Sequence, residues 1–266
     1  MDKSDTPELQ FETSYTDALE SRSRGDFATA AKLFRTALAL ARSFGEADER
    51  VYNSLLGLAR CHYRLGNREQ AEEHYRHALR IMENQIGDDH PNRFASVLWE
   101  LAILYTDQSR FKEATLFFKQ AILMTSNSAG PQDRFVADCL WGMSKCLCAL
   151  GQLPDAERAI REAIAIYEAT GDDVSEFVLT NQNNLVSVLI EQLKFSQAIA
   201  EVEKAIAILS RPDPSQPANK TAEIANNLCQ LAWCQQRLND FEKAGRTLKK
   251  ALKITRAHDG PGSIRT

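Results

Sequence analysis

Few side chains in this chain of 266 residues have the type and spacing that chemistry requires. His74 and His77 lie three positions apart, so on a helix they would share one face and could hold a metal ion. Two solvated histidines are the simpler interpretation of that pair. His62 fits an interfacial core position better than a general base, and Cys139 lacks a third group that would orient a histidine beside it. We therefore predict no catalytic residue, no metal site and no enzyme activity.

The cysteines do not change this expectation. Their spacing contains no paired C-x-x-C and fits no zinc pattern, so buried free thiols are expected at Cys61, Cys139, Cys146, Cys148, Cys229 and Cys234. The sequence has no P-loop, no dinucleotide glycine fingerprint and no H-E-x-x-H, so no cofactor is predicted. Free thiols and a polar, acidic N-terminus without the features of a secretory signal indicate a cytoplasmic protein.

The strongest pattern is a repeat of about 42 residues. Each copy contains a three-residue break whose first two residues are mostly glycine or polar. One alanine lies three residues after the third residue of the break and another lies ten residues after it, as Ala114 and Ala121 follow Phe111. Apolar residues spaced by three and four on both sides predict two helices, and the short break makes them antiparallel. The breaks fall at 25–27, 66–68, 109–111, 151–153, 193–195 and 239–241.

This pattern resembles the tetratricopeptide repeat. The matching features are the Leu-Ala pairs of the first helices, such as Leu101-Ala102, the breaks, and the two alanines of each second helix. The longer period, together with Asn183-Asn184-Leu185 and Asn226-Asn227-Leu228, is similar to the kinesin-light-chain variety. The resemblance implies an all-α fold, a right-handed solenoid of six antiparallel helix pairs.

We expect one solenoid over residues 8–257, between a flexible N-terminus at 1–7 and a disordered tail at 258–266. Its six repeats are predicted at about 8–43, 46–86, 91–127, 131–170, 173–210 and 218–257. The net charge of −4 gives no overall attraction to nucleic acid, and no apolar run is long enough to span a membrane. The expected partner is therefore a protein or peptide, and the chain itself is expected to be a monomer or a weak homo-oligomer.

The resemblance implies that first helices line a concave groove and that particular positions before each break face it. All three tryptophans and four asparagines fall on those positions. Tryptophan is a typical interface anchor, and an amide can hold the backbone of an extended peptide. The alternatives are tryptophans that fill the core and asparagines that cap helices or face solvent. With the nearby cations, the predicted peptide-binding residues are Asn53, Arg60, Arg64, Trp99, Trp141, Lys145, Asn183, Asn184, Asn226 and Trp233.

Charge in this predicted groove is uneven. Arg22, Arg60 and Arg64 gather in the first two repeats, which would suit an acidic segment or a terminal carboxylate. The two-carboxylate clamp of chaperone-binding repeats is not reproduced, because Tyr15 and Leu19 occupy two of its positions. The acidic residues of the groove are Glu100, Asp107, Asp138 and Glu191.

The segment from Phe241 to Ala257 carries six cations and one acid. Such a helix is either a solvated end of the array or a docking site for an acidic partner. For the whole chain the favoured hypothesis is a non-catalytic scaffold that binds an extended peptide or a partner domain in its concave groove. The alternative is a structural subunit that assembles with itself into a larger complex.

Overall fold

A computed structural model describes residues 6–46, 48–85, 91–170, 175–210 and 219–259. These residues form twelve α-helices, one short 3-10 helix and no strand. The elements are α1 (Pro7–Ser23), α2 (Phe27–Ala41), η1 (Arg42–Phe44), α3 (Glu49–Arg64), α4 (Arg68–Gln85), α5 (Pro91–Asp107), α6 (Phe111–Ser128), α7 (Arg134–Ala149), α8 (Leu153–Thr170), α9 (Ser175–Glu191), α10 (Phe195–Leu209), α11 (Asn219–Arg237) and α12 (Phe241–Asp259).

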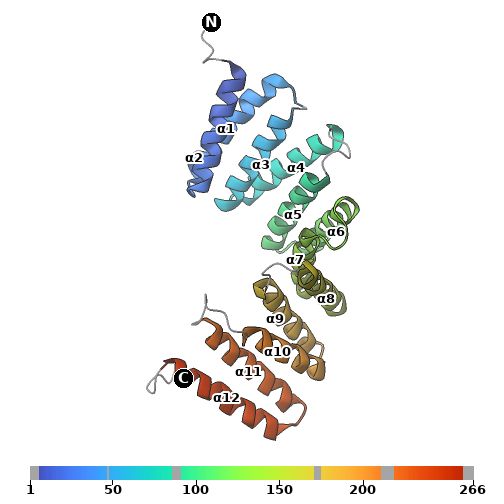
Figure 1. The fold of residues 1–266 in the computed structure, drawn as a ribbon. Coiled ribbons are helices and arrows are strands. Elements are labelled where there is room, and N and C mark those ends of the chain that lie inside the picture. Colours follow the sequence, from blue (N-terminus) through green and yellow to red (C-terminus); the bar gives the residue numbers. More distant parts are fainter. Residues whose placement is uncertain (1–5, 47, 86–90, 171–174, 211–218, 260–266) are drawn as a thin grey trace. The chain divides into compact units, whose positions relative to one another are not determined.

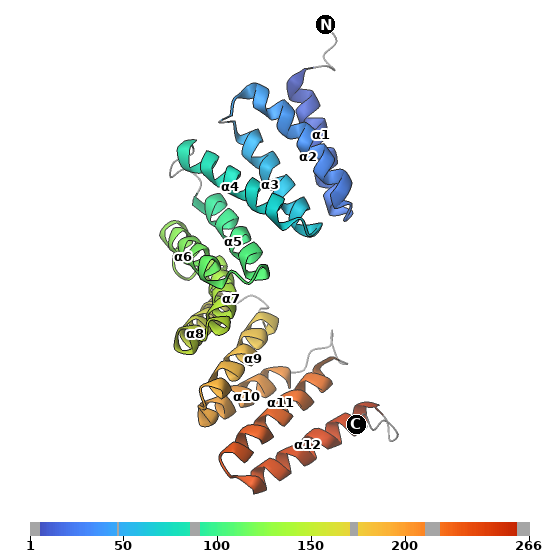
Figure 2. The same cartoon turned by 180° about the vertical axis from the view of Figure 1, so that it is seen from behind.

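The helices form two compact units, which we describe separately (Figures 1 and 2). The N-terminal unit, residues 1–131, contains α1 to α6, and the C-terminal unit, residues 132–266, contains α7 to α12. Within each unit every helix packs against the next one in the chain. The predicted all-α fold of six helix pairs is confirmed. The single solenoid over residues 8–257 stays a prediction, and the tails predicted to be flexible or disordered lie mostly outside the described residues.

All six predicted breaks are confirmed, and they share one backbone geometry. The first residue of each break has a positive φ, between 60° and 81°: Gly25, Gly66, Ser109, Gly151, Leu193 and Asn239. At the first break the Gly25 N–H donates to the Arg22 carbonyl and the Asp26 N–H to the Ser21 carbonyl. This left-handed residue ends one helix and reverses the chain within three residues.

The alanines of the second helices lie at the contact between paired helices. All twelve have at most 4% of their surface exposed. A small side chain at these positions lets the two backbones approach closely, as predicted. Gly57 marks a second close approach, between α3 and α2, because a Cβ there would lie 2.5 Å from the ring of Phe34.

Candidate functional site

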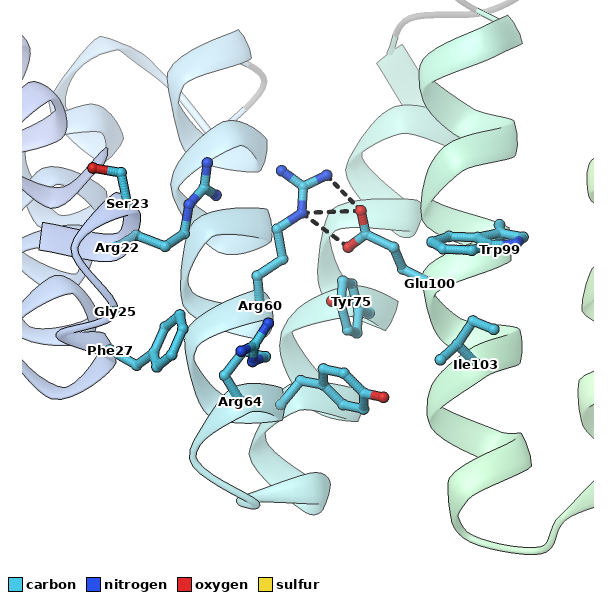
Figure 3. Close-up of a pocket in the computed structure, with 11 residues that line it drawn as sticks. Arg22, Ser23, Gly25, Phe27, Arg60, Arg64, Tyr75, Trp99, Glu100 and Ile103 are labelled. Atoms are coloured by element: carbon cyan, nitrogen blue, oxygen red, sulfur yellow. Dashed lines mark hydrogen bonds and ion pairs between the residues drawn. The ribbon is translucent and has the colours of Figure 1, made fainter. Parts of the chain in front are cut away.

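A pocket of about 810 Å³ opens among the first three repeats of the N-terminal unit (Figure 3). Helices α1, α3 and α5 supply most of its wall, and the start of α2 and the side chain of Tyr75 on α4 complete it. We call it the arginine pocket. It is lined by Arg22, Ser23, Gly25, Phe27, Arg60, Tyr63, Arg64, Tyr75, Trp99, Glu100 and Ile103.

Helical spacing places these side chains. Arg60 and Arg64 are four residues apart on α3, so they project from one face of that helix. Trp99 and Ile103 have the same spacing on α5, and Arg22 comes from the last turn of α1. The structure therefore brings together three of the predicted binding residues, Arg60, Arg64 and Trp99.

Arg60 is held by a carboxylate on the neighbouring repeat. Its Nε lies 2.9 Å and 3.0 Å from the two carboxylate oxygens of Glu100, and its Nη2 lies 2.5 Å from Oε1 (Figure 3). Burial would lower the pKa of the Arg60 guanidinium, but the hydrogen bonds and charge of Glu100 outweigh burial and raise it. A two-pronged contact of this kind fixes geometry as well as charge. Arg60 thus fastens α3 to α5 and is not a free cation for a ligand.

Arg22 and Arg64 are different. Within the described residues neither forms an ion pair; each lies over an aromatic ring, Arg22 5.9 Å from the centroid of Phe34 and Arg64 4.8 Å from that of Phe27. The three arginines and one glutamate of the pocket lining leave two positive charges in excess. A guanidinium group can bind a carboxylate through two parallel hydrogen bonds, and aromatic side chains line the same pocket. Both features suit an acidic peptide segment.

Tyrosines on the same wall stay protonated. Tyr63 donates from its hydroxyl to Asp107 at 2.5 Å, and burial together with that bond raises the pKa of Tyr63 to about 12. Burial, with the nearby Glu100 carboxylate, also raises the pKa of Tyr75. Both rings therefore act as neutral, partly apolar surface at physiological pH.

Asn53, also on α3, is not part of the arginine pocket. It lines a separate pocket of about 420 Å³ beside Glu12, Asp48 and Glu49, and its Nδ2 lies 3.4 Å from a carboxylate oxygen of Glu49. The surroundings of Asn53 are thus more acidic than those of Arg64. The two residues, predicted as one binding surface, face different pockets.

The remaining predicted residues lie in the C-terminal unit. On α7 the Lys145 ammonium lies 4.0 Å from the centroid of the Trp141 ring. On α11 Trp233 is 43% exposed and meets Phe195 edge to face at 5.6 Å. Asn183 and Asn184 on α9 are half-buried, and Asn226 on α11 is exposed.

Several pocket residues were not predicted. Tyr63 and Ile103 occupy groove-facing positions of their first helices, five and eight residues before the third residue of the break, so the same spacing rule could have found them. Phe27 and Tyr75 belong to second helices, which that rule does not cover. Only the packing of successive helices from α1 to α5 shows that Phe27 and Tyr75 line the pocket.

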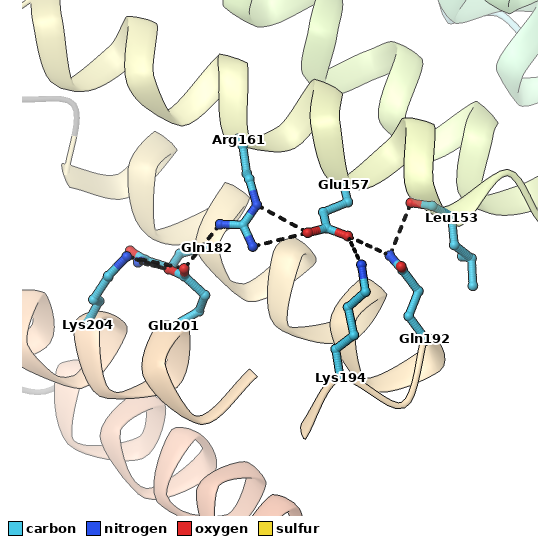
Figure 4. Close-up of polar contacts among 8 residues, drawn as sticks. All are labelled: Leu153, Glu157, Arg161, Gln182, Gln192, Lys194, Glu201 and Lys204. Carbon is cyan, nitrogen blue, oxygen red and sulfur yellow. Dashed lines mark hydrogen bonds and ion pairs between the residues drawn. The ribbon is translucent and has the colours of Figure 1, made fainter. Parts of the chain in front are cut away.

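A second polar cluster lies in the C-terminal unit and joins α8, α9 and α10 (Figure 4). Arg161 Nη atoms lie 3.1 Å from Glu157 and 3.3 Å from Glu201, and the Lys194 Nζ lies 2.7 Å from Glu157. Gln182 donates to Glu201, which is only 6% exposed. Each carboxylate has several donors and is closed to a ligand, so this cluster is structural.

The side chains with potential for chemistry are buried or dispersed. Among the described residues no group of three or more His, Cys, Asp and Glu side chains is arranged to hold a metal ion. Burial raises the pKa of the Cys61, Cys139 and Cys234 thiols, which disfavours the reactive thiolate. His62 is buried as predicted, with its ring centroid 5.5 Å from that of His74. No helix in the described part of the chain has both the length and the apolar character to cross a bilayer.

Comparison with known proteins identifies the family of the chain. Two family models of the tetratricopeptide repeat match it, one at residues 18–84, 50–124 and 93–169, the other at residues 225–258. The chain belongs to the tetratricopeptide-repeat family. Repeats of this family in general mediate contacts between proteins and are non-catalytic.

One relative is a plant protein. The Arabidopsis thaliana protein named KINESIN LIGHT CHAIN-RELATED 3 is 26% identical over 235 residues, which are 87% of this chain but 35% of that protein. The chain therefore spans about a third of that relative's length.

Solved structures support the same fold. BtubC (BKLC) from P. vanneervenii has a TM-score of 0.66 at 21% identity, over 98% of this chain and 97% of that one. The apo form of RapI also has a TM-score of 0.66, at 13% identity, over 93% and 98% of the two chains. At these identities the similarity concerns the fold alone.

Proposed function

We propose that this protein is a non-catalytic interaction scaffold and that its arginine pocket binds an acidic, extended segment of a partner protein. The observation that carries the proposal is the pair Arg22 and Arg64, two arginines without a carboxylate partner among the described residues. Trp99 and Tyr63 line the same pocket and offer apolar surface for a side chain of the same segment. Charge and aromatic surface together favour a peptide over a small metabolite.

A cytoplasmic adaptor role is part of this proposal. All six cysteines are free, and four of them are buried, which suits a reducing compartment. The name of the plant relative, which refers to kinesin light chains, favours an adaptor over a catalytic subunit.

Affinity capture tests the proposal. Wild-type protein and the Arg22→Ala/Arg64→Ala variant would serve as baits in a native lysate, and the captured proteins would be compared by mass spectrometry. The matched control is Arg24→Ala/Arg68→Ala, which removes two exposed arginines from the same repeats but outside the pocket. We expect one set of partners for the wild type and the control, depleted for the pocket variant. Equal capture by all three baits would exclude the arginine pocket as the binding site.

Self-assembly is the second candidate. Exposed apolar side chains on α6, Leu116 and Leu123, favour it because such surface is often covered in a complex. Sedimentation at increasing concentration tests this candidate, since a subunit that assembles with itself should form species that grow with concentration.

A further inference from the structure

The outer face of α12 carries an apolar row. Phe241, Leu248 and Leu252 are spaced by seven and four residues, so they lie on one stripe of the helix, and they are 66%, 42% and 49% exposed. This stripe is not the face that holds α12 in place. Ala244 and Ala251 are buried, and Thr247 is buried and donates to Gln235 on α11 at 2.9 Å.

The position of Leu248, at the centre of this stripe, is covered in the other second helices that are followed by a first helix of their own unit. The position of Leu248, seven residues after the third residue of the break, is occupied there by Phe34, Tyr75, Ile160 and Val202, each at most 2% exposed. The first helix that follows each of these second helices packs against it: α3 against α2, α5 against α4, α9 against α8, and α11 against α10. Leu38 and Leu79 are likewise buried at the position of Leu252, in α2 and α4. Leu248 and Leu252 therefore have the register of a surface that takes a helix.

Charge indicates what kind of helix fits. Lys249, Lys253 and Arg256 follow the stripe along its solvent side, all exposed and without an ion pair among the described residues. Lys250, on the opposite side of the helix from the stripe, is also exposed and without an ion pair among the described residues. Two cations are neutralised, Lys243 by Asp240 at 2.7 Å and Arg246 by Glu242 at 2.6 Å. Among the described side chains, the unpaired charge beside the stripe is therefore entirely positive.

A second copy of this chain is a poor occupant. Pairing α12 with another α12 would place these lysines and arginines against one another, which is unfavourable. The face of α1 at the corresponding first-helix positions is polar, with Thr13, Asp17 and Glu20 exposed where Val, Leu, Met or Cys is buried in α5 and α7. Helix α1 thus offers acid but no apolar row.

We infer that the outer face of α12 docks an amphipathic helix of another protein, whose apolar row covers Phe241, Leu248 and Leu252 and whose flank carries Asp or Glu opposite Lys249, Lys253 and Arg256. The partner continues the alternation of packed helices by one more element. Hydrophobic burial supplies the affinity, and the basic flank selects acidic helices and speeds their association.

Two synthetic peptides of about five helical turns test this inference. Both have the same leucine row, and the flanking positions are Glu in one and Lys in the other. Fluorescence anisotropy of labelled peptide measures binding to the full chain, and circular dichroism measures the helix gained. We expect the Glu peptide to bind at least tenfold more tightly than the Lys peptide, and to become helical on binding.

Variants locate the site. Leu248→Glu/Leu252→Glu should weaken binding of the Glu peptide at least tenfold, while the matched control Leu116→Glu/Leu123→Glu, two leucines 61% and 62% exposed on α6, should bind as the wild type does. Lys249→Glu/Lys253→Glu leaves the apolar row intact and should reverse the peptide preference, which decides the question even if the leucine variant fails to fold. Arg22→Ala/Arg64→Ala should have no effect, so this inference and the proposed function fail separately.

Three results would overturn the inference. The first is equal affinity of the two peptides for the wild type. The second is full affinity in a folded Leu248→Glu/Leu252→Glu variant. The third is a concentration-dependent dimer of the wild type that the same variant abolishes, because a second copy would then cover the stripe.

Discussion

Replacement of Leu193 by glycine should stabilise the C-terminal unit. Leu193 has φ 60°, in the left-handed region, where an L-residue with a side chain costs about 1–2 kcal/mol. Glycine removes that cost but loses more entropy on folding, about 0.5–1 kcal/mol. The leucine side chain is 68% exposed, so its removal forfeits little apolar burial. The net gain expected for Leu193→Gly is about 0.5–1 kcal/mol.

The turn itself would be unchanged, because its bonds involve only the backbone: the Leu193 N–H donates to Ile190 at 2.9 Å and the Lys194 N–H to Leu189 at 2.8 Å. Gly151, with φ 71°, is the matched reverse case, and Gly151→Ala should lose about 1 kcal/mol. Urea unfolding followed by helical circular dichroism and by the emission of Trp141 and Trp233 measures both changes. A lower urea midpoint for Leu193→Gly would refute the assignment of strain to this break.

Further predictions concern packing and pH. Gly57→Ala should destabilise the protein by about 1–3 kcal/mol, measured by urea unfolding, because the added methyl group meets the buried Phe34 ring; a neutral result would mean that α3 and α2 are less tightly packed. Ala121→Trp, at a fully buried position of α6, should cost more than about 3 kcal/mol, and a smaller cost would place Ala121 away from the helix contact. Burial opposes ionisation of Glu201, but hydrogen bonds from Lys204 and Gln182 outweigh it and lower its pKa. The unfolded chain therefore takes up protons first as the pH falls, and the stability that Glu201 contributes above about pH 4.3 is lost below it. Glu201→Gln should make the loss of unfolding free energy with falling pH shallower below about pH 4.3, and an unchanged slope would contradict this.

The helices of this fold could be predicted from the sequence because the same pattern occurs in six copies. Breaks, helix pairs and buried alanines recur at fixed spacing, and each copy supports the others. The backbone conformation within a break was harder to predict from the sequence. Glycine at Gly25 indicates a left-handed residue, but leucine at Leu193 does not, although both have positive φ. The pattern specifies contacts between neighbouring helices only, so it does not show where the chain divides into its two compact units.

The lining of the arginine pocket could be predicted in part. Periodicity places Arg60, Arg64 and Trp99 on adjacent first helices, and they do line one pocket. It does not indicate that Glu100 pairs with Arg60, while Arg64 has no ion pair among the described residues and lies over Phe27, because that depends on side-chain reach between repeats. Nor does periodicity reveal the apolar row of α12. The six cations of that helix led to a prediction based on charge alone, and Leu248 is exposed at a position that is buried in other second helices.

The central claim, that the arginine pocket binds an acidic segment, is tested most directly by calorimetric titration with the acidic peptide of a captured partner. The account predicts that Arg22→Ala/Arg64→Ala and Trp99→Ala each weaken binding by about 1–3 kcal/mol, with less dependence on salt for the arginine variant. Arg24→Ala/Arg68→Ala should bind as the wild type does. Full affinity in both the arginine variant and Trp99→Ala would contradict the account.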